Sequence, residues 1–210
     1  AVPMTDRLPD AYFDRMYAYS VDPWQLGQRW YEQRKDAITM ALLPHPRYRH
    51  AFEPGCSVGV LTEQLASRCD RVTAADVVPA ALQAASRRLT EAGHGDAVTL
   101  LCRSIDDGWP ATDFDLIVLS EVGYYLESAA LRATLDRELP RLTNPATVIA
   151  AHWRHAVADY PMSGDKTNEV IAATPGLHRI GGFRDDDITV DVFDTHSPVS
   201  VAARTAVPGA

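Results

Sequence analysis

A loop in the first third of the chain has the residue types needed to hold a charged ligand against backbone N–H groups. It comprises Glu53, Pro54, Gly55, Cys56, Ser57, Val58 and Gly59. The loop follows a predicted strand and precedes a predicted helix, so N–H groups of the helix N-terminus face whatever lies over it. Gly55 and Gly59 have no side chains, so a ligand can approach the loop backbone closely.

The spacing of this loop separates two classes of ligand. Cys56 and Ser57 stand where the dinucleotide pattern G-x-G-x-x-G has the glycine that makes room for pyrophosphate. A cationic sulfonium ligand without phosphate suits the loop better, with the carboxylate of Glu53 at its base. The loop therefore favours S-adenosylmethionine, and the alternative is a plain tight turn after a strand.

Two later positions are placed to bind an adenosine. Asp76 ends the second predicted strand, where a carboxylate can accept hydrogen bonds from both ribose hydroxyls, and Val77 can pack on the adenine. Capping of the helix that opens at Pro79 is the alternative role for Asp76. The candidates for the adenine amino edge follow the next strand and are Ser104, Ile105 and Asp106. The alternative for Asp106 is a solvated loop carboxylate, because two adjacent acidic residues in a loop are usually solvated.

Residues that could handle a proton follow the fourth and fifth predicted strands. Methyl transfer from a sulfonium is an in-line displacement, so the protein aligns the acceptor and, where needed, removes its proton. Glu121 follows Ser120 at the carboxyl end of a strand and could accept a proton or hold an ammonium; a surface or capping carboxylate is the alternative. His152 and His155 are further candidate bases, or structural histidines. They lack an obvious third ligand, so no metal is expected.

Aromatic residues are predicted to enclose the acceptor. The predicted substrate contacts are Trp24, Tyr124, Tyr125 and Tyr160. Trp30 and Arg34 are predicted to close the cofactor site from an N-terminal helix. The alternative for the aromatic residues is core packing, which is common for aromatics at helical spacing.

Strands and helices alternate along the chain and carry these residues. The predicted strands are Tyr48–Phe52, Arg71–Asp76, Ala97–Cys102, Phe114–Ser120 and Ala146–His152. The predicted helices are Pro23–Leu42, Gly59–Arg68, Pro79–Ala92 and Ala129–Leu139. Two β-rich runs, Ile188–Thr195 and Val199–Thr205, are joined too closely for a parallel crossover and are predicted to pair antiparallel. The pattern is that of a mostly parallel α/β fold.

Size, charge and cysteine content narrow the function classes. The 210 residues fit one domain, which we divide into an N-terminal helical lid (1–45) and a Rossmann-like core (46–210). The net charge of -8 lacks the basic footprint of nucleic-acid or membrane binding, so neither partner is expected. The three cysteines show no CxxC spacing, and no apolar run is long enough to span a bilayer. A cytoplasmic protein with a small-molecule substrate is expected.

Three motifs, EPGCSVG, AADVVPAAL and FDLIVLSEVGYYL, resemble the successive motifs of class I S-adenosylmethionine-dependent methyltransferases. The resemblance covers most of the chain from Arg49 to His152. The stretch DPWQLGQRWYEQRKDAI resembles the nodulation protein S family, whose members methylate an amino group of a deacetylated chitooligosaccharide. The resemblance implies a seven-stranded sheet of order 3-2-1-4-5-7-6 with helices on both faces.

The resemblance also implies roles for particular residues. Glu53, Gly55 and Gly59 would form the loop on the methionine side of the cofactor, and Asp76 would contact the ribose. Ser120 and Glu121 would lie beside the transferring methyl group.

Together these observations favour an S-adenosylmethionine-dependent methyltransferase that acts on a small polar acceptor and leaves S-adenosylhomocysteine. An amine, as in an amino sugar, is favoured over a hydroxyl because Glu121 and the acidic chain suit a cationic substrate. The alternatives are a small-molecule O-methyltransferase, a nicotinamide-dependent oxidoreductase, and a non-catalytic binding module with the same fold. The missing glycine and the expected terminal hairpin disfavour the oxidoreductase.

Overall fold

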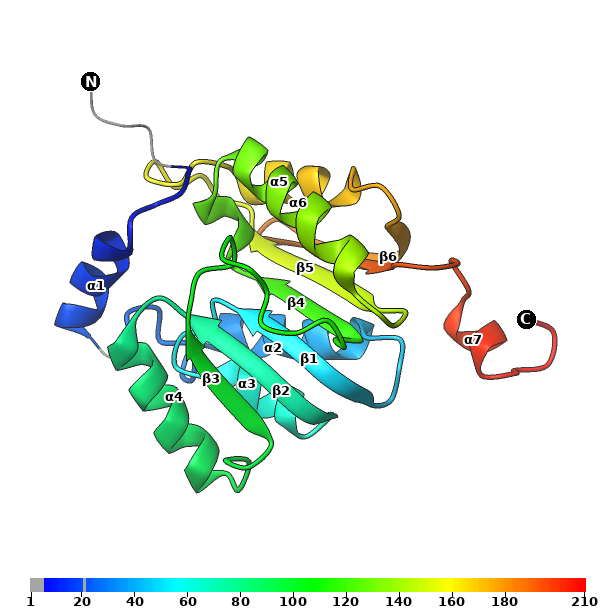
Figure 1. The fold of residues 1–210 in the computed structure, drawn as a ribbon, viewed down its shortest axis with the longest axis horizontal. Coiled ribbons are helices and arrows are strands. Elements are labelled where there is room, and N and C mark those ends of the chain that lie inside the picture. The colour runs from blue at the N-terminus through cyan, green and yellow to red at the C-terminus, as the bar shows by residue number, and fades with distance from the viewer. Residues whose placement is uncertain (1–5, 21) are drawn as a thin grey trace.

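A seven-stranded sheet forms the centre of the protein (Figure 1). The structure is a computed structural model that describes residues 6–20 and 22–210, so residues 1–5 and 21 of the predicted lid lie outside the described residues. The strands are β1 (Tyr48–Pro54), β2 (Cys69–Asp76), β3 (Val98–Cys102), β4 (Leu116–Ser120), β5 (Thr147–Trp153), β6 (His178–Arg184) and β7 (Ile188–Asp194). Their order is β3-β2-β1-β4-β5-β7-β6, with β7 antiparallel to both of its neighbours. The predicted strand order is confirmed.

Helices cover both faces of this sheet. They are α1 (Asp10–Tyr19), α2 (Trp30–Leu42), α3 (Val60–Ala66), α4 (Pro79–Glu91), α5 (Ser128–Glu138), α6 (Gly164–Ala172) and α7 (Val201–Arg204), with short 3-10 helices η1 (Gly123–Tyr125) and η2 (Leu139–Arg141). In Figure 1, α5 and α6 lie in front of the sheet, whereas α2 and α3 lie behind it. No helix in the described part of the chain is long and apolar enough to cross a membrane.

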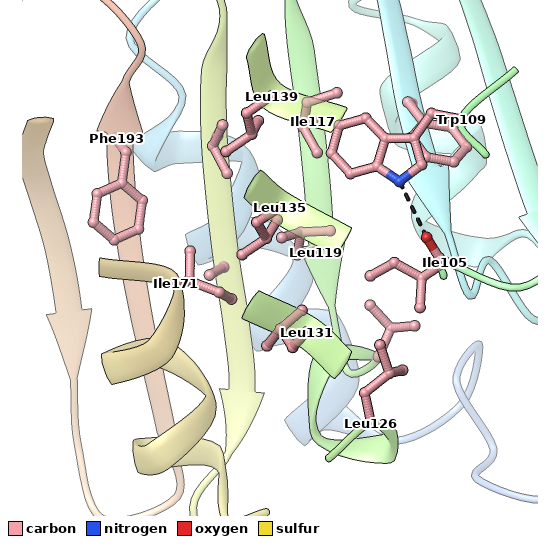
Figure 2. Close-up of a cluster of buried hydrophobic side chains, with 14 of the residues drawn as sticks. Ile105, Trp109, Ile117, Leu119, Leu126, Leu131, Leu135, Leu139, Ile171 and Phe193 are labelled. Carbon is pink, nitrogen blue, oxygen red and sulfur yellow. Dashed lines mark hydrogen bonds between the residues drawn. The ribbon is translucent and has the colours of Figure 1, made fainter. Parts of the chain in front are cut away.

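The hydrophobic core on the α5 and α6 face holds β4 in place. Figure 2 shows Leu131 and Leu135 of α5 beside Leu119 of β4. Ile171 of α6 belongs to the same cluster and lies beyond β5 in this view. These side chains are fully buried. The other side of β4 packs in a second cluster that includes residues of α3. Both faces of β4 are therefore apolar, as is typical of a parallel strand covered on two sides, and only its carboxyl end reaches the site.

The N-terminal segment differs from the prediction. The helix expected from Pro23 begins at Trp30, because residues 23–24 and 26–28 form turns and Gln25 has a positive φ of 55°. Pro23 and Gly27 are residues that favour turns, which outweighs the aromatic spacing used to extend the helix. An additional helix, α1, precedes these turns and lies against the opening of the site.

The C-terminal hairpin also differs from the prediction. Residues 188–194 form β7, but β7 pairs with β6 rather than with Val199–Thr205. Gly181 and Gly182 weaken the strand pattern of β6, which is why this strand was not predicted. Within the run expected as the last strand, residues 201–204 form the single turn of α7. The prediction of an antiparallel edge was right, but its second strand was wrongly assigned.

Candidate active site

A pocket of about 390 Å³ lies at the carboxyl ends of β1, β2 and β4, and residues of α1 and α2 also line it. The residues chosen from sequence that line this pocket are Trp24, Glu53, Gly55, Cys56, Ser57, Asp76, Val77, Ser104, Ile105, Ser120, Glu121, Tyr124, Tyr125 and Tyr160. The chosen residues outside the lining are Trp30, Arg34, Gly59, Asp106, His152 and His155. The parallel sheet thus gathers at one edge residues that are far apart in the chain.

The loop after β1 has the backbone that its glycines suggested. Gly55 has φ +72°, and an added Cβ would lie 2.7 Å from Cγ2 of Val122. Gly59 has φ +84° and precedes α3; an added Cβ would lie 3.0 Å from the Cβ of Ala85 on α4. Gly59 therefore permits close packing of helices outside the pocket, whereas Gly55 lies at the pocket itself.

Two buried carboxylates lie at the ends of β1 and β2. Glu53 accepts a hydrogen bond from Thr62 Oγ1 at 2.5 Å, and burial raises its pKa to about 8. Asp76 accepts hydrogen bonds from the backbone N–H groups of Ser57 at 2.9 Å and Val78 at 3.0 Å. Burial raises the pKa of Asp76, and these N–H groups oppose the shift. Asp76 therefore binds the loop after β1 and is also exposed to the pocket.

Helix α1 contacts the loop after β1 through a residue that the sequence analysis missed. The hydroxyls of Tyr17 and Ser57 are hydrogen bonded, and both residues are buried. Tyr17 packs edge to face against Trp24, with ring centroids 5.7 Å apart. Phe13 of the same helix packs on Tyr125 at 4.8 Å. The aromatic spacing of residues 12–17 could have indicated this helix, but nothing in it specified its partner.

The loop after β3 forms the far end of the pocket. Ser104 and Ile105 line it, whereas Asp106 lies outside and accepts a hydrogen bond from the Ser104 hydroxyl. Asp106 also pairs with Arg7, with Nε and Oδ1 3.2 Å apart. Asp106 therefore links this loop to the segment before α1 rather than facing the pocket.

Glu121 has two hydrogen-bond donors and an unusual backbone. Its Oε1 accepts from the Trp153 N–H at 2.8 Å, and its Oε2 accepts from the Tyr124 hydroxyl. Its φ of 55° lies in the left-handed region, which is uncommon outside glycine and clusters at functional sites. The tertiary structure therefore fixes the Glu121 carboxylate at the end of β4.

The two histidines chosen as candidate bases lie away from the pocket lining. His152 is fully buried; its Nδ1 bonds Asn168 Oδ1 at 2.8 Å and its Nε2 accepts from the Gly123 N–H at 3.1 Å. Burial lowers the pKa of His152 to about 4, so the ring is neutral at pH 7. His155 is exposed and lies 2.6 Å from Asp187. These positions suit structural histidines, because neither nitrogen pair faces the pocket.

Trp30 and Arg34, chosen to close the cofactor site, point elsewhere. Trp30 is 71% exposed. Arg34 pairs with Asp185 at 3.0 Å and lies over the Phe183 ring at 5.4 Å. The face of α2 that lines the pocket instead carries residues that the sequence analysis missed: Tyr31, Glu32, Lys35 and Asp36. Their spacing on one helical face was a signal, but such a face is usually solvated.

The missed face of α2 is buried and charged. Lys35 is 4% exposed, and its Nζ lies 2.6 Å from Glu32 Oε2. Burial would lower the pKa of Lys35, but the charges of Glu121, Glu32 and Asp36 outweigh burial and raise it. Burial also raises the pKa of Asp36, to about 7. The described residues contain no group of three or more metal-ligating side chains placed to hold an ion.

A family profile described as Nodulation protein S (NodS) matches residues 14–165 of the chain. Nodulation protein S from Sinorhizobium fredii strain NGR234 is 35% identical over 126 residues, which cover 60% of this chain and 57% of that protein. The protein of the same name from Bradyrhizobium diazoefficiens is 32% identical over 145 residues, which cover 64% of this chain and 68% of that protein. The chain thus spans between about half and two thirds of the length of these relatives.

Solved structures show the same fold. A crystal structure described as a putative methyltransferase from Pseudomonas syringae is 34% identical, with a TM-score of 0.64, over 79% of this chain and 99% of that chain. The crystal structure of N-methyltransferase NodS from Bradyrhizobium japonicum WM9 in complex with S-adenosyl-L-homocysteine is 23% identical, with a TM-score of 0.74, over 88% and 96%. The architecture is therefore the class I methyltransferase fold.

Proposed function

The chain belongs to the nodulation protein S family, and from this premise we propose that it is an S-adenosylmethionine-dependent N-methyltransferase. The proposed acceptor is the amine of a small polar molecule, best represented by a glucosamine unit of a deacetylated chitooligosaccharide. The observation that carries the proposal is the position of Glu121. It lies at the end of β4, in the same pocket as the loop after β1.

The residues of the pocket fit S-adenosylmethionine. Asp76 is a buried carboxylate at the end of β2, where a ribose can be bound, and Ser104 and Ile105 provide polar and apolar contacts beyond it. Gly55 permits close approach at the loop after β1. A related family structure holds the demethylated product, S-adenosyl-L-homocysteine. When bound, the cofactor would supply an electrophilic methyl group on a cationic sulfur.

The carboxylates around the acceptor side favour an amine over a hydroxyl. Glu32, Asp36 and Glu121 all line the pocket, and the positive charge of Lys35 faces all three. Three carboxylates exceed one ammonium, so an additional cation is stabilised there. Other basic residues of the lining include Arg7, Arg29 and Arg103, of which Arg7 is paired with Asp10 and Asp106. Glu121 is thus proposed to orient an ammonium or amine next to the transferable methyl group.

Measurements of cofactor binding and of methyl transfer test two different parts of this proposal. Calorimetry with S-adenosylhomocysteine and NAD should show tight binding of the first alone. A methyl-transfer assay should then yield N-methylated product from a glucosamine oligomer and none from the fully N-acetylated oligomer of equal length. Tight NAD binding would support the oxidoreductase alternative. S-adenosylhomocysteine binding without transfer to any amine or hydroxyl acceptor would support a binding module.

A further inference from the structure

Helix α2 presents to the pocket a largely buried carboxylate, Asp36, which accepts no hydrogen bond from the described residues. Asp36 is 5% exposed and lines the pocket. Its side chain accepts no hydrogen bond from residues 6–20 or 22–210, although buried carboxylates are normally well bonded. Two other polar atoms of α2, the Tyr31 hydroxyl oxygen and Glu32 Oε2, are fully buried without a hydrogen-bond partner among the described residues, although Glu32 is ion-paired with Lys35. Two unsatisfied groups on one wall of a pocket indicate a ligand contact.

The position of Asp36 is between the cofactor loop and the acceptor side. Its charge acts on Glu53, which lies near the carboxyl end of β1. The charge of Glu121, which follows β4, acts in turn on Asp36. Tyr31, five residues earlier, packs edge to face against Trp153 at the end of β5, with ring centroids 5.0 Å apart. This wall of the pocket therefore lies where methyl donor and acceptor must meet.

Glu121 and Glu32 are less available than Asp36 as proton acceptors. Both oxygens of Glu121 already accept hydrogen bonds, from the Trp153 N–H and the Tyr124 hydroxyl. These donors occupy both carboxylate oxygens of Glu121. Glu32 is ion-paired with the ammonium of Lys35 at 2.6 Å, and this pair opposes the rise in the pKa of Glu32 that burial causes. Asp36 faces the charges of Lys35, Glu32 and Glu121 without a hydrogen bond from any described residue.

We propose that Asp36 is the catalytic base that takes the proton from the acceptor's ammonium group, while Tyr31 bonds and orients the same nitrogen. This inference rests on the proposed N-methyltransferase function. One N–H bond of the ammonium breaks and its proton moves to a carboxylate oxygen of Asp36. The freed nitrogen lone pair forms a bond to the methyl carbon, and the carbon–sulfur bond breaks with its electron pair remaining on sulfur. The products are the methylated ammonium, the neutral thioether and protonated Asp36, which then loses its proton to solvent.

The electrostatics of the pocket match this assignment. Burial, together with the charges of Glu32 and Glu121, raises the pKa of Asp36 to about 7 and outweighs the opposing charge of Lys35. A base with a pKa near the working pH is the most effective for proton transfer. Because only the ionised carboxylate accepts a proton, kcat should fall as pH decreases through this value. A bound cationic cofactor lowers the pKa, so the decline should begin at or below about pH 7.

The test compares Asp36→Asn with the wild type at saturating glucosamine oligomer over pH 5.5 to about 10. We expect kcat of Asp36→Asn to be lower by roughly 10²–10⁴-fold at neutral pH and to recover as pH rises, because solvent then removes the proton. Asp36→Glu should restore part of the activity. Asp70→Asn is the control, since Asp70 is exposed and pairs with Arg47 far from the pocket. S-adenosylhomocysteine affinity should be the same in all of these variants.

Several results would overturn the proposal. An unchanged pH profile in Asp36→Asn, with normal S-adenosylhomocysteine affinity, would remove Asp36 as the base while the proposed function stands. Weakened S-adenosylhomocysteine binding without a changed pH profile would assign the carboxylate to the cofactor's own ammonium. If the wild-type protein does not bind S-adenosylhomocysteine, both the proposed function and the role of Asp36 are overturned. Tyr31→Phe should raise KM for the oligomer more than it lowers kcat, and an unaltered KM would exclude its orienting role.

Discussion

Replacement of Gly55 with alanine tests how the loop after β1 makes room for its ligand. Gly55 has φ +72°, and an added Cβ would lie 2.7 Å from Cγ2 of Val122, a residue of the pocket lining. Gly93→Ala is a matched control, because Gly93 has φ +81° and an added Cβ would have nothing within 4 Å. Both substitutions place a side chain in the left-handed region, at a cost of about 1–2 kcal/mol. Only Gly55→Ala adds steric overlap, which costs about 1–3 kcal/mol more.

These terms predict a free energy of unfolding lower by about 1–2 kcal/mol in Gly93→Ala and by about 2–5 kcal/mol in Gly55→Ala. Denaturant unfolding followed by circular dichroism measures both losses. Because Val122 must move within the pocket, Gly55→Ala should also bind S-adenosylhomocysteine at least about tenfold more weakly, or about 1.4 kcal/mol. Calorimetry should show wild-type affinity for Gly93→Ala.

The double variant Gly55→Ala/Val122→Ala removes the overlapping methyl group, Cγ2 of Val122, and leaves only the Val122 Cβ, which would lie 3.0 Å from the added Cβ. It should recover part of the affinity that Gly55→Ala loses, although the cavity left by Val122 has its own cost in stability. Equal losses of stability in Gly55→Ala and Gly93→Ala would refute the steric argument. Wild-type affinity in a folded Gly55→Ala protein would show that the ligand binds elsewhere.

Three other substitutions test the remaining assignments. Asp76→Ala should weaken S-adenosylhomocysteine binding by about 1.5–3 kcal/mol in calorimetry, the scale of lost hydrogen bonds to a charged group, and an unchanged Kd would remove Asp76 from the ribose site. Glu121→Gln should lower kcat/KM for the amine acceptor by roughly 10–100-fold, the scale of one lost hydrogen bond to a charged group, with little change in cofactor Kd, whereas wild-type kcat/KM would end its proposed orienting role. The pKa of His152 falls from 6.5 to about 4 on folding, so its contribution to stability is complete above pH 6.5 and is lost as pH falls towards 4. Wild-type protein should thus lose up to about 3 kcal/mol more than His152→Asn over this range in urea unfolding, and parallel pH curves for the two proteins would contradict this.

The alternation of apolar strands with helices was sufficient to predict a mostly parallel α/β fold, whereas the order of the sheet came from the family resemblance. The run at 116–119 is apolar at every position, which is typical of a parallel strand covered on both faces, and the structure buries all four residues. The same reasoning missed β6 because Gly181 and Gly182 remove the side chains on which the pattern depends. It extended α2 to Pro23 because aromatic spacing does not reveal where a turn interrupts a helix.

Some residues of the site could likewise be identified from local sequence pattern, whereas others required the tertiary structure. Glu53, Asp76 and Glu121 were identifiable from sequence because each lies at the carboxyl end of a parallel strand or directly after it, and these ends share one edge of the sheet. Tyr17, Tyr31 and Asp36 were not, because the sequence of a helix does not say which of its faces will meet a pocket. Only the packing of α1 and α2 against the sheet settled this, because that packing, rather than residue type, places Asp36 in the pocket lining at 5% exposure without a hydrogen bond from the described residues.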